Sequence, residues 1–412
     1  MNHSFRAILA RVALGAMAFA LASAAAAAGP KAYVGNFKDN TVSAIDTGTG
    51  AVVATIPVVA GPHGMGVSPD GRTLYVSGDG SSEVSVIDTA TDRVTGKINV
   101  GKTPHGMAMA GDGRTLMVCV YGEDKVVFID TASQQVVASV PVPKPHTVSI
   151  RPDGKLAYVS SQEPGKFALV VVDLATRAVA RTLPLEKTPR DLEFGYDGKA
   201  LYFTMAGVNA VQVLDPSSDK VVAEIPTGAS PHIAGFFRGA PAGTVVVQGP
   251  GELTLFNPTT NAVLRSVAVG KQPHWVAASG DGMSAYVTNE GSNDVTVVDL
   301  ATGQTKTIAV GNAPRKVVVQ RAAVNAAASG ARISIANFAF VPPEIAVVAG
   351  QSVTWSNDDG APHGLMFKDG AAGTDLLLPG KSFSRTFDKP GTYEYACSTH
   401  PYMTGKVVVR TS

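Results

Sequence analysis

Residues 284–299, Ser-Ala-Tyr-Val-Thr-Asn-Glu-Gly-Ser-Asn-Asp-Val-Thr-Val-Val-Asp, contain two short runs in which bulky apolar residues alternate with small or polar ones. Alternation with a period of two predicts β-strands with one buried face, and the Gly-Ser-Asn segment between the runs predicts a turn. The second run ends in Asp299, and this strand-ending position recurs along the chain. It is occupied by Asp46, Asp88, Asp130, Asp173, Asp215, Asn257 and Asp299.

These seven positions are separated by 42, 42, 43, 42, 42 and 42 residues, which is too regular for chance. Each unit has room for about four short strands, and most units also carry an Asp-Gly turn. The turns are Asp70-Gly71, Asp112-Gly113, Asp153-Gly154, Asp197-Gly198 and Asp281-Gly282. A repeat of about 40 to 45 residues with four strands is typical of a propeller blade, so residues 31–320 are predicted to form a seven-bladed β-propeller. We interpret the recurring Asp residues as turn caps.

The phase of the repeat predicts how the ring closes. The first strand contains Tyr33-Val34, and residues 315–319 have the pattern of the innermost strand of the first blade, so both ends should share one blade. Tyr286-Val287-Thr288-Asn289, with the variants Tyr75-Val76-Ser77 and Tyr158-Val159-Ser160, resembles the Tyr-Val-Thr-Asn family of β-propellers. Since propellers carry many unrelated activities, this resemblance implies a fold rather than a function.

The composition excludes several classes of protein. Of 412 residues, 45% are hydrophobic, 16% are charged and only 2 are Cys, which excludes a disordered chain and a disulfide framework. Lys plus Arg number 34 against 33 Asp plus Glu, so nothing favours binding to nucleic acid or to an anionic membrane. Residues 1–28 combine Arg6 and Arg11 with an apolar run and small residues, as in a secretory signal peptide. We expect an exported, periplasmic protein with no membrane span after cleavage.

A second domain is predicted after the repeats. Residues 321–331 are small and polar without a strand pattern, which predicts an interdomain linker. From Arg332 the alternation returns, for example in residues 352–355 and 406–409, and predicts a small antiparallel β-sandwich over residues 332–412. The expected fold class is therefore all-β.

Residues 393–403, Tyr-Glu-Tyr-Ala-Cys-Ser-Thr-His-Pro-Tyr-Met, place a thiol, an imidazole and a thioether at steps of three residues: Cys397, His400 and Met403. Upstream, His363 offers a second imidazole. Two His and one Cys with a weak axial Met is the ligand set of blue copper, because sulfur favours Cu(I) and imidazole accommodates Cu(II). A buried Cys or a core Met is the more common role of either residue alone, but the combined pattern favours a metal site.

Residues 391–409 resemble the amicyanin branch of the cupredoxins, with its short Cys-x2-His-x2-Met loop, and residues 353–355 and Pro362-His363 match it as well. The resemblance implies one type 1 mononuclear copper. Its ligands would be His363, Cys397, His400 and Met403. Gly364 follows the first His, whereas the family usually has Asn there, whose side chain ties the two ligand loops together. This departure bears on the reduction potential and on loop rigidity rather than on the ligand set.

In this family solvent reaches the copper through the His of the Cys loop, which corresponds to His400. We therefore expect a redox partner protein to dock around Pro401 and Tyr402. Cys119 lies in an apolar strand, and we interpret it as inert core, although an oxidising compartment would also permit a disulfide with Cys397.

Five of the eight His residues follow a Pro at one position of the repeat, and Arg takes that position in the other two units. The seven residues are His63, His105, His146, Arg190, His232, His274 and Arg315. They precede the predicted innermost strands and should ring one mouth of the central channel. Such a ring could bind a second metal, a haem-like macrocycle, a small molecule or an anion. The alternative is a structural role, in which each imidazole forms a hydrogen bond to the neighbouring blade. Trp275, beside His274, either covers such a site or fills core, and we favour core.

A propeller followed by a cupredoxin resembles the layout of nitrous oxide reductase, although that family's cupredoxin needs two Cys and only Cys397 is present here. A second resemblance is to methylamine dehydrogenase, whose propeller subunit docks amicyanin. We favour an exported copper electron-transfer protein whose propeller binds a redox partner or a substrate. One alternative is an oxidoreductase with its active site in the ring, fed by the cupredoxin. The other is a non-catalytic copper-binding scaffold of the cell envelope.

Overall fold

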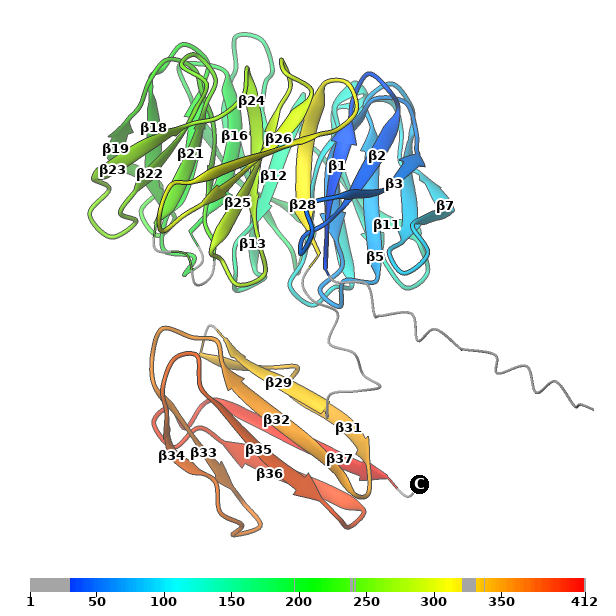
Figure 1. Cartoon of the computed structure of the whole chain (residues 1–412), viewed down its shortest axis with the longest axis vertical. Coiled ribbons are helices and arrows are strands. Elements are labelled where there is room, and N and C mark those ends of the chain that lie inside the picture. Colours follow the sequence, from blue (N-terminus) through cyan, green and yellow to red (C-terminus); the bar gives the residue numbers. More distant parts are fainter. Residues whose placement is uncertain are drawn as a thin grey trace, which may run out of the picture.

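The computed structural model describes residues 30–410 except 196, 238, 239, 241, 321–330 and 337. Regular structure in these residues is β-strand apart from one short 3-10 helix, η1 (Tyr121–Glu123). Figure 1 shows the strands of residues 31–319 gathered in one body and those of residues 331–410 in another. The predicted signal peptide lies outside the described residues, as does the predicted linker up to residue 330. Ala331, which the sequence placed in the linker, already begins a strand.

Residues 31–319 form seven four-stranded antiparallel sheets, so the prediction of a seven-bladed propeller is confirmed. From the first blade to the seventh, the innermost strands are β28 (Pro314–Val319), β4 (Pro62–Val67), β8 (Pro104–Met109), β12 (Pro145–Ile150), β16 (Pro189–Phe194), β20 (Pro231–Gly235) and β24 (Pro273–Ala278). The second strands are β1 (Lys31–Asn36), β5 (Thr73–Gly78), β9 (Thr115–Val120), β13 (Leu156–Ser161), β17 (Leu201–Met205), β21 (Gly243–Val247) and β25 (Ser284–Asn289).

The outer half of each blade follows in the same order. The third strands are β2 (Thr41–Asp46), β6 (Glu83–Asp88), β10 (Lys125–Asp130), β14 (Ala168–Asp173), β18 (Ala210–Asp215), β22 (Glu252–Phe256) and β26 (Asp294–Asp299). The outermost strands are β3 (Val52–Pro57), β7 (Arg93–Asn99), β11 (Gln135–Pro141), β15 (Ala178–Pro184), β19 (Lys220–Pro226), β23 (Val263–Ala268) and β27 (Thr305–Ala309).

Burial within a blade follows from its place between two neighbours. All six residues of β1 are buried, whereas the outermost strand β3 is mostly exposed, because the middle of a blade is covered on both faces. The recurring Asp residues are turn caps, as predicted. The Asp46 carboxylate accepts hydrogen bonds from the backbone N–H of Thr49 at 2.8 Å and from its hydroxyl at 3.0 Å. Gly71 in the Asp-Gly turn has φ of 72°, a conformation that favours glycine.

The ring closes in the first blade, where β28 pairs with β1, so the expectation that both ends share one blade is confirmed. Gln320 fastens this pairing. Its Oε1 accepts a hydrogen bond from the backbone N–H of Lys31 at 3.2 Å, and its Nε2 donates to the carbonyl oxygen of Gly71 at 2.7 Å. The Lys31 side chain forms a buried ion pair with Asp92 in the second blade at 2.7 Å. Residues from both ends of the repeat region therefore lock the first two blades together.

The second body is a two-sheet sandwich, as predicted. One sheet has the order β30-β29-β32-β35 and the other β31-β37-β36-β33-β34. Their bounds are β29 (Ala331–Ala336), β30 (Ala339–Val341), β31 (Glu344–Val348), β32 (Gln351–Asn357), β33 (His363–Phe367), β34 (Thr374–Leu377), β35 (Ser382–Phe387), β36 (Gly391–Ala396) and β37 (Thr404–Arg410). The expectation of a purely antiparallel sandwich is wrong, since β29 and β32 are parallel, as are β31 and β37. The chain changes sheet before and after β31, which places strands that are not consecutive side by side in the same direction.

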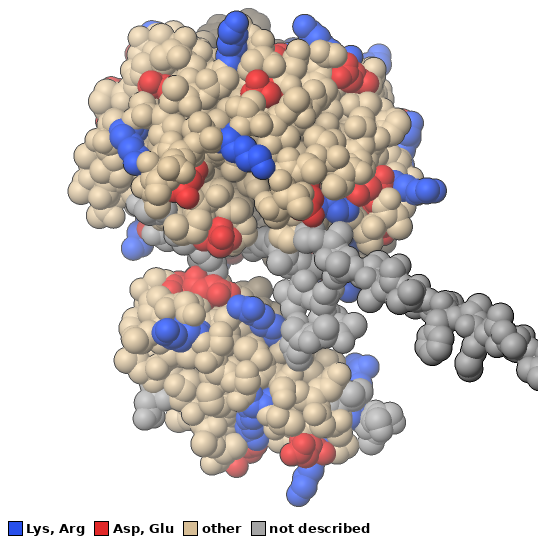
Figure 2. Space-filling model, viewed as in Figure 1, with Lys and Arg blue, Asp and Glu red and all other residues tan. Residues whose placement is uncertain are grey.

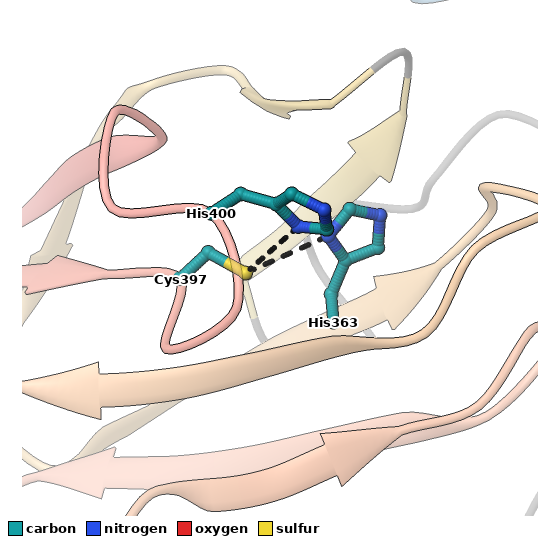
Figure 3. Close-up of side chains that lie close together, drawn as sticks. All are labelled: His363, Cys397 and His400. Atoms are coloured by element: carbon teal, nitrogen blue, oxygen red, sulfur yellow. Dashed lines mark hydrogen bonds between the residues drawn. The ribbon is translucent and has the colours of Figure 1, made fainter.

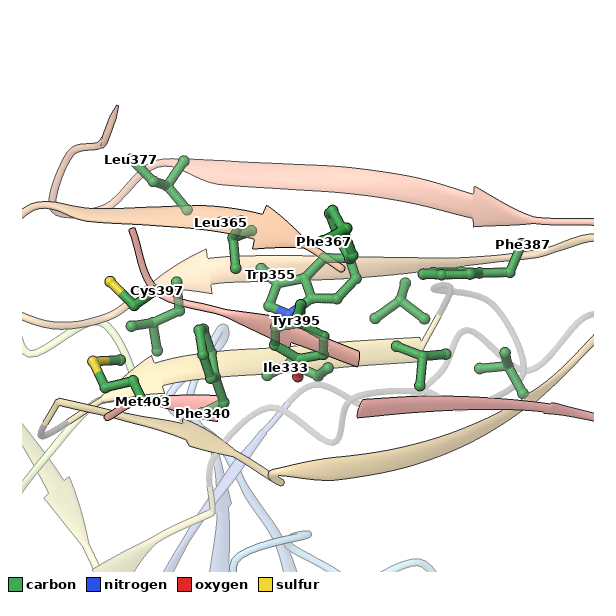
Figure 4. Close-up of a cluster of buried hydrophobic side chains, with 14 of the residues drawn as sticks. Ile333, Phe340, Trp355, Leu365, Phe367, Leu377, Phe387, Tyr395, Cys397 and Met403 are labelled. Carbon is green, nitrogen blue, oxygen red and sulfur yellow. The ribbon is translucent and has the colours of Figure 1, made fainter. Parts of the chain in front are cut away.

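The core of the sandwich is rich in aromatic residues (Figure 4). Trp355, Tyr395 and Phe387 are buried between the sheets, and the rings of Trp355 and Tyr395 meet edge to face at 5.2 Å. Figure 4 shows Cys397 and Met403 at one end of this core. The two sulfur-bearing side chains are therefore packed into the end of the hydrophobic core.

The surface carries charges of both signs. Figure 2 shows Lys and Arg interspersed with Asp and Glu on the visible face of both bodies, in keeping with a formal net charge of +1. No helix among the described residues is long and apolar enough to cross a membrane.

Candidate metal centre

The loop between β36 and β37 brings together side chains that are three residues apart. The backbone N–H of Cys397 donates to the carbonyl oxygen of Met403 at 3.0 Å, and the N–H of Met403 donates to the carbonyl oxygen of His400 at 2.9 Å. These bonds close the loop into a tight turn. Thr399 lies inside it, with its hydroxyl 3.1 Å from Cys397 Sγ and 3.0 Å from His400 Nδ1.

His363 reaches the loop from the neighbouring strand, because β33 pairs with β36. The Nδ1 atoms of His363 and His400 each lie 3.6 Å from Cys397 Sγ, and the two imidazole centroids are 5.0 Å apart. Figure 3 shows both imidazoles directed toward the sulfur. The structure thus brings together three of the four predicted ligands through atoms that can bind a metal.

The spacing of these atoms fits a single metal ion. A metal about 2.3 Å from sulfur and about 2.0 Å from nitrogen in a trigonal plane separates the two donors by about 3.7 Å. The observed separations are 3.6 Å, and all three donor atoms lie within 4.8 Å of one another. Within the part of the chain that the structure describes, this is the only group of three or more His, Cys, Asp or Glu with such spacing. Cys397 and His363 are fully buried, and Met403 is 3% exposed at the same end of the core (Figure 4).

A carboxylate fixes the far side of the His363 ring. His363 Nε2 lies 3.1 Å from Asp359 Oδ2, so Nε2 carries the proton and Nδ1 offers its lone pair to the metal position. Burial lowers the pKa of His363, and the Asp359 carboxylate opposes this shift. Asp359 also accepts a hydrogen bond from the backbone N–H of Phe338 at 2.8 Å. Asp359 could not be predicted from the sequence, since a carboxylate four residues before a His in a loop is no signal by itself.

Asn357 holds the loop that leads to His363. Its side chain is fully buried, and Nδ2 donates to the carbonyl oxygens of Ala361 at 2.8 Å and Leu377 at 2.7 Å. Its Oδ1 accepts a bond from the backbone N–H of Asp359 at 3.0 Å. Gly364 has no side chain to tie the two ligand loops together, and the bonds of Asn357 hold only the loop that carries His363.

The surface at His400 is apolar and aromatic. Pro401 and Tyr402 are exposed, and the Tyr402 side chain is 71% accessible. Phe338, which the sequence analysis did not identify, is 43% exposed and meets the rings of His363 and His400 edge to face at 5.4 Å and 5.0 Å. His400 itself is partly buried between these side chains.

The second set of predicted residues converges at the propeller. Each is the second residue of an innermost strand, directly after the Pro that begins it. Neighbouring imidazoles lie close together with tilted planes, with centroid distances of 3.7 Å for His63 and His105, 4.1 Å for His105 and His146, and 4.2 Å for His232 and His274. Five imidazoles therefore gather at one mouth of the channel.

Hydrogen bonds between blades occupy part of this ring. Nδ1 of His105 lies 3.0 Å from the carbonyl oxygen of His146, and Nδ1 of His146 lies 3.0 Å from that of Arg190. These two rings therefore agree with the interpretation in which each imidazole forms a hydrogen bond to the neighbouring blade. Burial lowers the pKa of His63, His146 and His274 and lowers that of His105 to about 3, so these rings are neutral at pH 7.

The two arginines of the ring have partners of their own. Arg190 donates to Ser230 Oγ at 2.8 Å and to Gln248 Oε1 at 3.0 Å. Arg315 donates to Glu290 Oε1 at 3.1 Å and stacks on Phe37, 3.5 Å from its ring centroid. Arg315 is therefore paired with a carboxylate, whereas the partners named for Arg190 are uncharged acceptors.

Acidic and aromatic groups also lie beside the ring, and of these only Trp275 was considered from the sequence. The buried Asp191 accepts a hydrogen bond from Thr147 Oγ1 at 2.8 Å, and its Oδ2 lies 3.0 Å from His232 Nδ1. The interpretation of Trp275 as core holds only in part. It packs against core residues, yet it also lines the central cavity, where Lys316 Nζ lies 3.0 Å from its ring centroid.

Cys119 lies far from this chemistry. It is fully buried in the third blade, and both Cys119 and Cys397 are free thiols, so the disulfide that the sequence permitted is absent from the structure. Burial raises the pKa of the Cys119 thiol, which makes it a poor nucleophile.

Comparison with known proteins agrees with both halves of this description. Residues 327–410 match the copper binding proteins of the plastocyanin/azurin family, and residues 6–110 match the YNCE-like beta-propellers. The C-terminal region is 39% identical over 89 residues to amicyanin-alpha of Methylorubrum extorquens, which covers 20% of this chain and 75% of the relative. It is 33% identical over 93 residues to amicyanin of Paracoccus versutus, which covers 21% of this chain and 70% of the relative.

Solved structures match the propeller at low sequence identity. A chain of Kuenenia stuttgartiensis hydrazine synthase matches with a TM-score of 0.61 and 24% identity, covering 65% of this chain and 92% of that one. Apo AztD from Citrobacter koseri matches with a TM-score of 0.55 and 17% identity, covering 71% of this chain and 97% of that one. At these identities the matches show the fold alone. Through its C-terminal domain, which follows a YNCE-like β-propeller, the chain belongs to the plastocyanin/azurin family of copper-binding proteins.

Proposed function

We propose that this chain is an exported electron-transfer protein whose C-terminal domain holds one type 1 copper through His363, Cys397, His400 and Met403. The observation that carries the proposal is the placement of two imidazole Nδ1 atoms, each 3.6 Å from a buried Cys Sγ on a tight loop. When bound, copper supplies a one-electron couple between Cu(I) and Cu(II).

The surrounding residues prepare the donors for this task. The backbone bonds of the 397–403 loop and the side chain of Asn357 hold the donor atoms at metal-binding spacing. Burial of Cys397 and His363 keeps bulk water from them. A donor set that suits both oxidation states and moves little supports rapid electron exchange.

Electrons would enter and leave through the surface at His400. We place the docking site of a redox partner protein on Phe338, Pro401 and Tyr402, because these exposed side chains surround the partly exposed ligand. Aromatic side chains are enriched at protein interfaces, since they bury much apolar area at little entropic cost.

The decisive experiment measures copper per chain and the visible spectrum of the mature protein. Wild type is expected to bind one copper and to be blue, and Cys397→Ser is expected to lose both the colour and the metal. Cys119→Ser is the matched control, because it removes the other buried thiol far from the site and should leave colour and copper unchanged. A colourless wild type would refute the proposal.

A second candidate function is binding of a small ligand by the propeller. It is favoured by the convergence of five imidazoles at one mouth of the channel. The cavity of about 510 Å³ in the propeller is lined by other residues. Because Nδ1 of His105 and of His146 already faces a neighbouring carbonyl oxygen, we propose a small molecule rather than a second metal. Copper retained by Cys397→Ser and then lost on changing His105 and His232 would contradict this and indicate a second metal centre.

A further inference from the structure

The central channel of the propeller contains a mostly uncharged cavity with two ionisable side chains in its lining, Glu193 and Lys316. It measures about 510 Å³ and is lined by residues of the innermost strands beyond the ring position. An adjoining cavity of about 210 Å³ shares four of its lining residues. The shared residues are Met109, Glu193, Trp275 and Lys316.

Lys316 is a cation of the channel that forms no direct ion pair among the described residues, although the Asp191 and Glu193 carboxylates lie near enough to raise its pKa. Its Nζ lies over the Trp275 ring, 3.0 Å from the centroid. Across the described ranges of the chain, Nζ forms no hydrogen bond and no ion pair within 4.0 Å. The ring arginines differ, since Arg190 and Arg315 are engaged by Ser230, Gln248 and Glu290.

Glu193 provides the second polar group of the cavity. It lies on β16 with Ser149 as its hydrogen-bonding neighbour, and Ser149 Oγ also accepts a bond from the backbone N–H of Phe194 at 3.3 Å. Burial raises the pKa of Glu193 to about 7, and burial lowers the pKa of Lys316 to about 8. Near neutral pH the cavity therefore offers an ammonium group and, in part of the molecules, a protonated carboxyl group, both of which donate hydrogen bonds.

We propose that this cavity binds a small carboxylate or a similar oxyanion, with Lys316 and Glu193 as donors and the indole of Trp275 as the apolar wall. An anion meets here an ammonium group that makes no hydrogen bond or direct ion pair within the described residues, whereas a cation would have to displace Lys316 from the indole face. The other nearby carboxylate, Asp191, already has Thr147 and His232 as neighbours. The proposal goes beyond the functions proposed above: it is independent of the copper site and of the imidazole ring, because no residue of that ring lines either cavity.

The test uses trifluoroacetate as the probe and follows its ¹⁹F resonance during titration of the full mature protein at pH 6.5. Wild type is expected to show saturable binding, and Lys316→Met to bind about tenfold more weakly or less, because a charge-assisted bond is lost. Lys316→Arg should retain binding. Lys271→Met is the matched control, since Lys271 is exposed outside the cavity, and its affinity should equal that of wild type. Equal affinity in Lys316→Met and wild type, or no saturable binding, would overturn the proposal.

The pH profile tests the role of Glu193. The charged or titratable groups facing this pair are Asp191, whose charge acts on Lys316, and the ring imidazoles of His146 and His232, which lie close to Asp191. Affinity in wild type should fall as the pH rises through 7, because Glu193 then loses its proton and repels the anion. Glu193→Gln keeps a donor without a charge, so its affinity should follow only the loss of the Lys316 proton. That loss is expected at a lower pH than in wild type, because the Glu193 carboxylate no longer raises the Lys316 pKa. Identical profiles in the two proteins would remove Glu193 from the site.

Two variants separate this site from the other proposals. Cys397→Ser should bind trifluoroacetate like wild type, so failure of the copper proposal would leave this result untouched. His105→Gln should also bind it, and loss of binding there but not in Lys316→Met would move the ligand to the imidazole ring and refute the cavity site. Trp275 and Trp355 are the only tryptophans, and Trp275→Phe should abolish any change of emission on anion binding.

Discussion

The Nε2 atom of His363 lies 3.1 Å from the Oδ2 atom of Asp359, while Nδ1 of the same ring faces Cys397 Sγ at 3.6 Å. One imidazole thus joins a fixed carboxylate to the metal position. Such a carboxylate sets the tautomer and orientation of a ligand and strengthens it as a donor. Because Asp359 is itself held by backbone N–H of Phe338, the ligand is oriented before metal arrives.

Asp359→Asn should weaken copper binding by about 10- to 100-fold and raise the reduction potential, because a neutral amide supports the charge of Cu(II) less than a carboxylate does. Competition with a chelator and a redox titration measure the two effects. Asp358→Asn is the matched control, since Asp358 bonds to Ser334 and Ser356 rather than to a ligand. An unchanged potential in Asp359→Asn would show that the carboxylate has no electronic role.

Asn357→Ala should reduce the free energy of unfolding of the sandwich by about 1–3 kcal/mol, since buried partners of its amide are left unsatisfied. The emission of the buried Trp355 during denaturant unfolding reports on this domain. Thr354→Ala, on the exposed face of the same strand, should change stability by less than about 0.5 kcal/mol. Similar losses in both variants would argue against a special role for Asn357.

Tyr402→Lys should slow electron self-exchange between two copies of the loaded protein by about tenfold, because like charges then meet at the exposed surface beside His400. Line broadening in NMR of mixed oxidation states measures the rate. The visible spectrum should stay unchanged, since Tyr402 is not a predicted ligand. The same rate in wild type and variant would place the exchange surface elsewhere.

The buried His105 should make the propeller less stable in mild acid. The pKa of His105 is about 3 in the folded protein. Between pH 7 and pH 5 this imidazole therefore takes up a proton in the unfolded chain but stays neutral in the folded one. This lowers the free energy of unfolding by about 2 kcal/mol over that interval. Denaturant midpoints at both pH values should differ less in His105→Gln than in wild type. Equal differences would mean that His105 is protonated in the fold.

Gln320→Ala should reduce the stability of the propeller by about 1–3 kcal/mol, because the buried N–H of Lys31 and the carbonyl oxygen of Gly71 lose their partner. Hydrogen exchange resolved by peptide should show faster opening in the first blade than in the fourth. Equally faster hydrogen exchange in all blades would show that Gln320 does not stabilise the first blade in particular.

The sequence predicted most of the fold because a blade is a local unit. The strand-ending Asp at steps of 42 or 43 residues gives the number of blades, and the Cys-x2-His-x2-Met loop gives three donors from one turn. It missed the parallel pairing of β29 with β32, because register between distant strands depends on how the chain crosses between sheets.

The finer parts of the sites depend on contacts between segments that no motif links. Asp359 reaches His363 across a turn, and Lys316 lies against Trp275 from the next blade. Glu193 and Lys316 are 123 positions apart in the sequence and share one cavity only because both lie on innermost strands. The repeat predicts where such positions fall but not which of them carries the unusual side chain.

The pairing of β28 with β1 also has a mechanical consequence. Val319, the last residue of β28, is paired with Ala32 near the start of β1, and the chain continues from this point toward the sandwich. A load applied between the two domains therefore pulls on β28 at its C-terminal end and breaks its hydrogen bonds to β1 one after another rather than all at once. Tension on the sandwich would open the ring at the first blade before any other part of the propeller yields.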